Sequence, residues 1–96
     1  MTLRQLIQER RDDIVSIAAR HGASNVRLFG SVARGEDGPD SDVDFLVEAG
    51  PTTSSWFPAG LILDLEQILD RPVEIVTDRG LNPLIRWHVL QEAIPL

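Results

Sequence analysis

The sequence contains no cysteine and no lysine, and it has no long apolar run. Without cysteine, disulfide bonds, thiolate zinc sites and cysteine nucleophiles are excluded, and a cytoplasmic location is expected. All 9 basic residues are arginine, so the phosphate-binding lysine of a Walker-type nucleotide site is missing. No segment approaches the roughly 18 consecutive apolar residues of a transmembrane helix, and the charged N-terminal stretch does not match a signal peptide. We therefore expect a soluble protein with no membrane association.

The length of the chain bounds the number of domains, and its charge bears on nucleic-acid binding. A chain of 96 residues has room for one small domain around a single core, and we expect residues 1–96 to form it. The formal net charge is −6, from 15 acidic and 9 basic residues. Affinity for long nucleic acids usually depends on a basic face, so independent nucleic-acid binding is not expected. A net negative charge helps to keep a small domain soluble. It does not explain why acidic residues cluster around the Gly-Ser loop.

Hydrophobic periodicity and turn residues predict alternating helices and strands. Three helices are expected, at residues 2–22, about 55–70 and 82–93, with Thr2 and Asn82 as the N-caps of the first and the last. Three short apolar runs predict strands, at residues 25–29, 42–48 and 73–76. A single helical turn at residues 31–34, closed by Gly35, and a loop at residues 36–41 complete the chain. Asp40 and Ser41 are expected to cap the backbone of that loop, with Asp40 also a remote candidate ligand. This order predicts an α/β (α+β) fold in which helices flank a small mixed β-sheet.

Two carboxylates interrupt the apolar run of the second predicted strand. Because successive side chains of a strand point to opposite faces, Asp42 and Asp44 share one face and lie roughly 7 Å apart. Val43, Phe45 and Val47 occupy the other face, which we expect to pack on a helix. Two like charges so placed repel each other unless a positive charge lies between them.

Three familiar templates fail to account for these residues. Glu36 stands where a P-loop has its lysine. Phe45 replaces the obligatory glycine of an EF-hand loop, and Pro51 replaces its bidentate glutamate. A serine-histidine triad has little support, because neither His21 nor His88 accompanies a nucleophile elbow. Both histidines are expected to be ordinary surface or core residues.

The arrangement that remains is a Gly30-Ser31 turn, ten intervening residues, Asp42-x-Asp44 on a strand, and Glu74 on the next strand. It resembles the nucleotidyltransferase superfamily typified by DNA polymerase β, and within it the minimal nucleotidyltransferase (MNT) domains. The segments LFGSVARGE, PDSDVDFLV, LDRPVEIV and EAIPL carry the resemblance over nearly the whole chain. It implies the polymerase β-like fold.

The resemblance also implies roles for individual residues. Asp42, Asp44 and Glu74, called here the three acids, would bind two Mg²⁺ ions, which prefer oxygen ligands, with Glu74 also placed as a base near the nucleophile. Many relatives carry aspartate at the position of Glu74, so reduced activity and a merely tolerated edge-strand glutamate are both open readings. Burial of a lone acid in a short apolar strand is costly, which favours a functional role for Glu74. The resemblance further implies that Gly30, Ser31 and Arg34 bind the nucleotide.

Two plainer readings compete with nucleotide binding at that turn. Gly30 and Ser31 alone would also suit an ordinary strand-to-helix turn. Arg34, which would neutralise the triphosphate with its planar fork, would also suit a solvated surface.

The implied function is transfer of AMP from ATP to a hydroxyl, a tyrosine of a partner HEPN-type RNase toxin, by an MNT antitoxin. The alternative is a catalytically weak or inactive antitoxin that neutralises its partner by binding and occlusion. Trp56, Phe57 and Trp87 are candidate interface anchors in that case, with core packing as the competing expectation. A third hypothesis is transfer to a small molecule such as an aminoglycoside. The sequence leaves a homo- or hetero-oligomer open.

Overall fold

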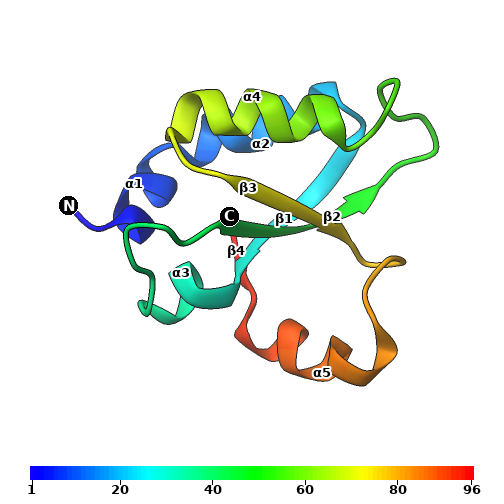
Figure 1. Cartoon of the computed structure of the whole chain (residues 1–96). Helices are drawn as coiled ribbons and strands as arrows, with labels where there is room; N and C mark the ends of the chain where they lie inside the picture. Colours follow the sequence, from blue (N-terminus) through cyan, green and yellow to red (C-terminus); the bar gives the residue numbers. More distant parts are fainter.

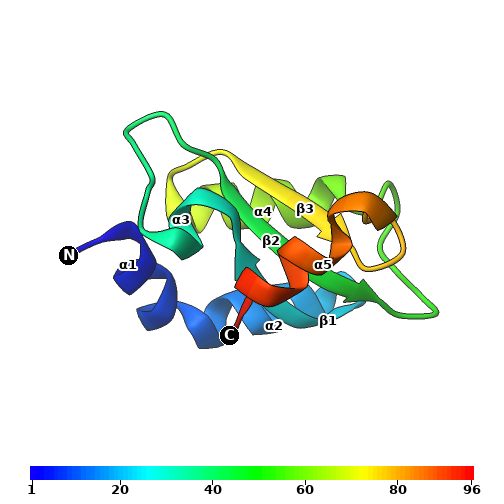
Figure 2. The same cartoon turned by 90° about the horizontal axis from the view of Figure 1, so that it is seen from below.

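A four-stranded mixed sheet, with helices on both faces, forms the protein (Figure 1, Figure 2). The computed structural model describes the whole chain, Met1–Leu96. The strands are β1 (Ala23–Phe29), β2 (Val43–Ala49), β3 (Val73–Thr77) and β4 (Ile94–Pro95), in the order β3-β2-β1-β4. β1 is antiparallel to β2 and β4, whereas β2 and β3 are parallel. The predicted small mixed sheet is confirmed.

Five helices surround the sheet. They are α1 (Leu3–Glu9), α2 (Arg11–Arg20), α3 (Gly30–Arg34), α4 (Ala59–Leu69) and α5 (Pro83–Glu92). Figure 1 shows α2 and α4 on one face, and α3 and α5 on the other. None of these helices combines the length and the hydropathy that a membrane crossing requires.

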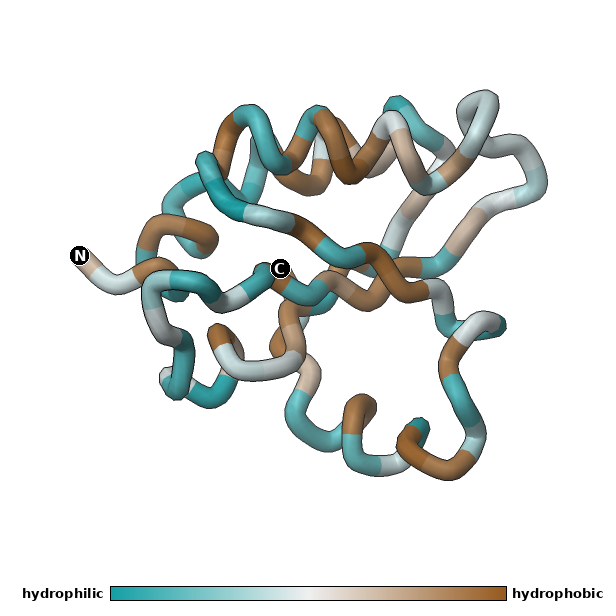
Figure 3. Tube along the Cα trace, in the orientation of Figure 1, coloured by the Kyte–Doolittle hydropathy of each residue, from teal (hydrophilic) through white to brown (hydrophobic).

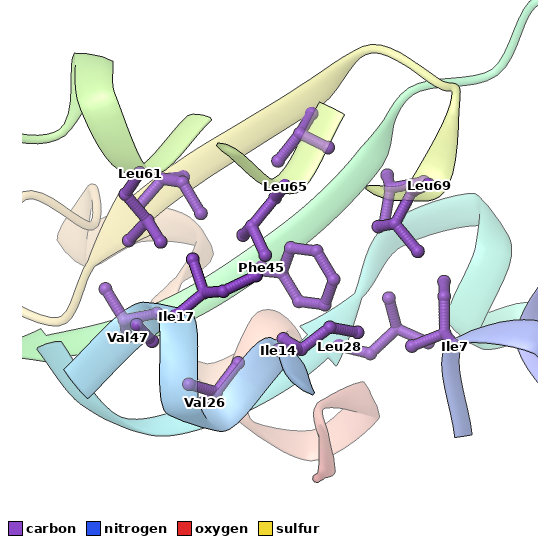
Figure 4. Close-up of a cluster of buried hydrophobic side chains, with 14 of the residues drawn as sticks. Ile7, Ile14, Ile17, Val26, Leu28, Phe45, Val47, Leu61, Leu65 and Leu69 are labelled. Carbon is purple, nitrogen blue, oxygen red and sulfur yellow. The ribbon is translucent and has the colours of Figure 1, made fainter. Parts of the chain in front are cut away.

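The main core lies between the sheet and the pair α2 and α4. Val43, Phe45 and Val47 are at most 1% exposed, which confirms that the apolar side of β2 faces helices. Phe45 lies among the side chains of α2, α4 and β1 in this cluster (Figure 4). The strands β2 and β3 are mostly apolar in Figure 3, whereas the loop between α3 and β2 is hydrophilic. Burial of apolar surface on this face is the main stabilising contribution.

A smaller cluster on the opposite face attaches α5. Leu46 of β2 is buried against Leu81 and Val89. Val89 is the one buried residue of α5. Four large apolar side chains of this helix remain exposed: Leu84, Ile85, Trp87 and Leu90. The attachment of α5 to the sheet is therefore slight.

Strand boundaries differ from the sequence prediction by one or two residues, and three differences are larger. The opening helix is two helices with a turn at Arg10, and Ile7 and Ile14 are both fully buried on either side of that turn. The fourth helix begins at Ala59 rather than near Ser55, because Trp56 has a left-handed backbone (φ 59°) that a helix does not accommodate. The two-residue strand β4 was not predicted, since so short a pairing has no periodicity.

The predicted helix caps are confirmed. Thr2 and Gln5 form a capping box at the start of α1. Gly35 ends α3 in a left-handed conformation (φ 72°). The Asn82 side chain accepts a hydrogen bond from the Leu84 N–H at the start of α5.

Both tryptophans are exposed, so core packing was the wrong expectation for them. Trp56 is 89% exposed and Trp87 is 63% exposed. Phe57 packs against the main core, as expected for a core residue. Trp56 lies three residues before α4 and Trp87 lies on α5, and these helices cover opposite faces of the sheet (Figure 1). One flat partner surface would therefore not contact both.

His21 connects three segments that are distant in sequence. Its Nδ1 lies 2.7 Å from the Ser54 Oγ, and its Nε2 lies 2.7 Å from the Asp64 Oδ2. The ring packs so close to Gly60 that a Cβ there would lie 2.9 Å from the His21 Cε1. No surface hollow is lined by this serine, histidine or aspartate. The set fastens the end of α2 to α4 and the loop before it, and sequence reasoning did not anticipate it.

We predict that His21→Ala lowers the free energy of unfolding by about 2 kcal/mol, because two side-chain hydrogen bonds and the packing of the ring are lost. His88→Ala is the matched control: His88 is exposed on α5, and a change within about 0.5 kcal/mol is expected. Urea denaturation followed by circular dichroism measures both. Equal losses in the two variants would contradict the role given to His21.

Candidate active site

The three acids gather where β2 and β3 begin. The parallel register pairs Asp44 of β2 with Glu74 of β3, so their side chains emerge on the same face of the sheet. Asp42 directly precedes β2, and the Val43 N–H donates to the Pro72 carbonyl oxygen at 2.9 Å, which fixes the pairing at this end. Asp42 and Glu74 are exposed, and Asp44 is half-buried. This face is opposite the main core.

Asp44 is electrostatically the most unusual group in the protein. The pKa of Asp44 is raised from 3.8 to about 6, with burial as the largest cause and a hydrogen bond shared with Glu74 as the next. Repulsion from the Glu74 and Asp42 carboxylates acts in the same direction, whereas Arg34 lowers the pKa of Asp44. A carboxyl that is hard to ionise beside other carboxylates is a frequent mark of a functional site.

Gly30 brings the chain up against Asp44. Its φ is +78°, and a Cβ built on it would collide with the Asp44 Oδ2. Only glycine combines that left-handed backbone with such a close approach. The turn between β1 and α3 therefore lies directly beside the half-buried carboxyl. Ser31 follows in the first turn of α3 and is half-buried.

Arg34 ends α3, and its exposed side chain is paired with two carboxylates. Its Nε donates to the Glu36 Oε2 at 2.9 Å, and its Nη1 donates to the Glu92 Oε2 at 3.0 Å. These hydrogen bonds raise the pKa of the Arg34 guanidinium above its ordinary value, with Glu36 the larger cause. Two carboxylates therefore hold the guanidinium, and one of them, that of Glu92, also contacts the Gly30 turn.

Glu92 is the member of the site that sequence reasoning missed. This residue of α5 accepts a hydrogen bond from the Gly30 N–H at 3.0 Å in addition to its contact with Arg34. The sequence signal was the C-terminal EAIPL segment, which carried a family resemblance but no predicted contact. Periodicity along α5 does not reveal a partner 62 residues away.

The loop before Asp42 is held in place by Arg71. Its Nη1 donates to the carbonyl oxygens of Gly38, Pro39 and Ser41 at 3.2, 3.0 and 3.3 Å. The Ser41 Oγ accepts from the Gly38 N–H at 2.8 Å, which confirms the loop-capping role predicted for this serine. Asp40, a remote candidate ligand, is exposed in the same loop.

The metal site expected from the sequence is not formed as a closed cluster. No group of three or more histidine, aspartate or glutamate side chains surrounds a common point. The three acids also line none of the surface hollows. A hollow of about 320 Å³ lies at the other ends of β2 and β3, between Glu48, Ala49, Gly50, Thr77, Asp78 and Arg79. The candidate active site is thus an open sheet face rather than a pocket.

One prediction about Glu74 rested on an incorrect premise. Burial of a lone acid in an apolar strand was expected to be costly, which favoured a functional role. Glu74 is exposed on β3, an edge strand of the sheet, so burial imposes no such cost. What favours a role for Glu74 is its register beside Asp44.

Family comparison agrees with this geometry. The model of the nucleotidyltransferase domain family matches residues 7–95. The chain therefore belongs to this family of nucleotidyltransferases.

Three individual proteins are similar to this chain. A candidate protein adenylyltransferase of Methanocaldococcus jannaschii is 35% identical over 88 residues, which is 92% of this chain and 95% of that protein. The solved structure of a candidate minimal nucleotidyltransferase is 49% identical, with a TM-score of 0.86, over 100% of this chain and 97% of that one. A toxin-antitoxin structure with AMP-PNP contains the same fold, with a TM-score of 0.67 at 24% identity, over 99% of this chain and 72% of that one.

We predict that Gly30→Ala lowers nucleotide transfer at least about 100-fold, because the new Cβ displaces the Asp44 carboxylate by an ångström or more. Gly35→Ala is the matched control, since Gly35 has the same left-handed backbone but nothing within 4 Å of a built Cβ. Gly35→Ala should cost about 1 kcal/mol of stability and leave transfer nearly unchanged. Release of pyrophosphate from ATP measures transfer, and parallel losses in the two variants would contradict this assignment.

We predict that the Asp44 carboxyl makes stability fall as pH rises. Its folded pKa is above its ordinary value, so its contribution is complete below about pH 4 and is lost as pH rises through about 6. With divalent cations chelated, the free energy of unfolding of Asp44→Asn relative to the wild type should rise by about 1 kcal/mol from pH 4 to pH 7, after allowance for solvent screening. Thermal unfolding across this range measures the difference. Asp40→Asn should follow the wild type, and a constant offset for Asp44→Asn would exclude the effect.

Proposed function

We propose that the protein transfers AMP from ATP to a hydroxyl of a partner protein. The observation that carries the proposal is the pairing of Asp44 with Glu74 on adjacent parallel strands, directly beside the Gly30 turn. Membership in the nucleotidyltransferase family supports the reaction class, and the similarity to a candidate protein adenylyltransferase supports a protein acceptor. Residues 1–96 act as one nucleotidyltransferase domain in this proposal.

Mg²⁺ fits the donor set on this face. The three acids offer only carboxylate oxygens, which are the ligands that Mg²⁺ prefers. They also gather like charges closely enough to raise the pKa of Asp44, and a divalent cation would offset that repulsion. Two Mg²⁺ ions held by Asp42, Asp44 and Glu74 would neutralise the triphosphate and favour ionisation of the attacking hydroxyl.

The Gly30 turn supplies the groups that position the nucleotide. The Gly30 N–H and the Ser31 hydroxyl are donors suited to phosphate oxygens, and the planar fork of Arg34 matches their geometry. In the reaction, the acceptor oxygen forms a bond to the α-phosphorus of ATP. The bond between that phosphorus and the bridging oxygen to the β-phosphorus breaks, and pyrophosphate leaves with the electron pair. Glu74 accepts the proton of the hydroxyl.

A partner toxin supplies the hydroxyl in this proposal. The three acids lie on an open face and line no hollow, so an acceptor reaches them from another molecule. A neighbouring fold was solved in a toxin-antitoxin structure with AMP-PNP, which favours a toxin as partner and an adenine nucleotide as donor. We infer a tyrosine of a cytoplasmic HEPN-type RNase as the acceptor, with the chain acting as its antitoxin by AMPylation.

Incubation with α-labelled ATP, Mg²⁺ and the neighbouring gene's product tests the proposal. The wild type should label the partner, and Asp42→Asn combined with Asp44→Asn should lower labelling at least about 1,000-fold, since two of the three carboxylate charges are removed. Asp12→Asn with Asp13→Asn is the matched control, because it removes two charges from α2 on the opposite face. A stable complex that shows no label with the wild type would rule out catalysis.

Occlusion without chemistry is the second candidate function. The net charge of −6 suits a basic RNA-binding surface, and the exposed Trp87, Leu84 and Leu90 of α5 suit its apolar parts. The same double aspartate variant separates the two functions. If it still silences the partner's RNase activity as well as the wild type does, occlusion is the mechanism. If it binds but no longer silences, transfer is required.

A further inference from the structure

The carboxylate of Glu92 occupies the donors that the proposed function gives to the triphosphate. Its Oε1 accepts from the Gly30 N–H at 3.0 Å and lies 3.1 Å from the Arg34 Nη1. Its Oε2 lies 3.0 Å from the same Arg34 nitrogen. The carboxylate therefore bridges the backbone and side-chain donors of the Gly30 turn.

This contact is more enclosed than the other carboxylate on Arg34. The Glu92 side chain is 27% exposed, whereas that of Glu36 is 66% exposed. Glu36 reaches only the Arg34 Nε. Of these two carboxylates, Glu92 alone contacts the Gly30 N–H.

A carboxylate and a phosphate group compete for such donors. Both present anionic oxygens, and a single N–H donates one strong hydrogen bond, so the Gly30 N–H cannot serve Glu92 and a phosphate oxygen together. Glu92 and a triphosphate held at Gly30 and Arg34 also repel each other. The triphosphate carries more charge than one carboxylate, so it is the stronger ligand once it arrives.

Displacement of Glu92 has a consequence for α5. The helix buries only Val89, and Glu92 is the residue that joins its last turn to α3. Trp87 and Leu90 lie in the same part of the helix and are 63% and 42% exposed. Without the Glu92 contact, this end of α5 is held by the buried Val89 and by the short pairing of β4 with β1.

We propose that Glu92 is an internal competitor of the nucleotide triphosphate, and that ATP binding displaces it and releases the last turn of α5. This inference rests on the proposed function, because it takes Gly30 and Arg34 as triphosphate ligands. The apparent affinity for ATP is lowered by the fraction of molecules in which Glu92 holds these donors. Nucleotide occupancy is thereby coupled to the apolar surface of α5.

Calorimetric titration with ATP and Mg²⁺, without the partner, tests the competition. Glu92→Gln keeps the shape of the side chain and removes its charge, and it should bind ATP about tenfold more tightly than the wild type. Glu92→Ala, which removes both contacts, should bind at least as tightly as Glu92→Gln. Glu36→Gln is the matched control for charge near Arg34, and its affinity should change by less than about twofold.

The outcomes separate the two proposals. Equal or weaker ATP binding by both Glu92 variants, with binding by the wild type intact, overturns the competition and leaves the proposed function standing. The competition is also overturned if Glu36→Gln gains as much affinity for ATP as Glu92→Gln, because the gain then reflects general electrostatics. Failure of every variant and of the wild type to bind ATP overturns the proposed function itself.

Trp87 fluorescence reports on α5 directly. In a Trp56→Phe background Trp87 is the only tryptophan, and its emission should shift on addition of ATP and Mg²⁺. Glu92→Ala in the same background should start near the shifted value and respond little. An unchanged emission in the background protein at saturating ATP would overturn the release of α5.

Discussion

The parallel pairing of β2 with β3 is the constraint on which the candidate site depends. Because side chains alternate along a strand, the register that turns Val43 and Phe45 into the core also turns Asp44 outward, beside Glu74. A slip of one residue would bury Glu74 and separate the pair. Two contacts stabilise this register. The Glu66 carboxylate accepts a hydrogen bond from the Val73 N–H at 2.9 Å, and Arg71 donates to the loop that leads into β2.

The site is built at some expense to the fold. The folded protein keeps Asp44 in a half-buried position where burial and the Glu74 carboxyl raise its pKa to about 6. It also places Gly30 in a left-handed backbone so that the turn contacts that same carboxyl. Neither feature helps the chain to fold, and groups that are unfavourable for stability gather where chemistry is done. The apolar cluster behind β2 compensates for them.

Local signals in the sequence predicted most of the fold, whereas the candidate site residues came chiefly from the family resemblance. The alternation from Val43 to Val47, the Thr2 cap and the Gly35 stop are properties of a few adjacent residues, and the structure confirms each of them. Contacts between distant segments could not be predicted in this way. Glu92 reaches Gly30 across 62 residues, and His21 joins Ser54 and Asp64 through tertiary packing alone. Exposure of Trp56 and Trp87 likewise depends on which distant segments cover each side chain, which composition does not encode.

The position of β3 at the rim of the sheet has a separate consequence. An outermost strand presents unpaired backbone groups to any other extended chain, and apolar residues such as Val73 and Ile75 make such strands prone to self-association. Glu74 is the sole charge within β3, and it is exposed. Its negative charge therefore also acts as a gatekeeper against edge-to-edge aggregation. Solubility alone would favour an acidic side chain at this position, whatever chemistry it performs.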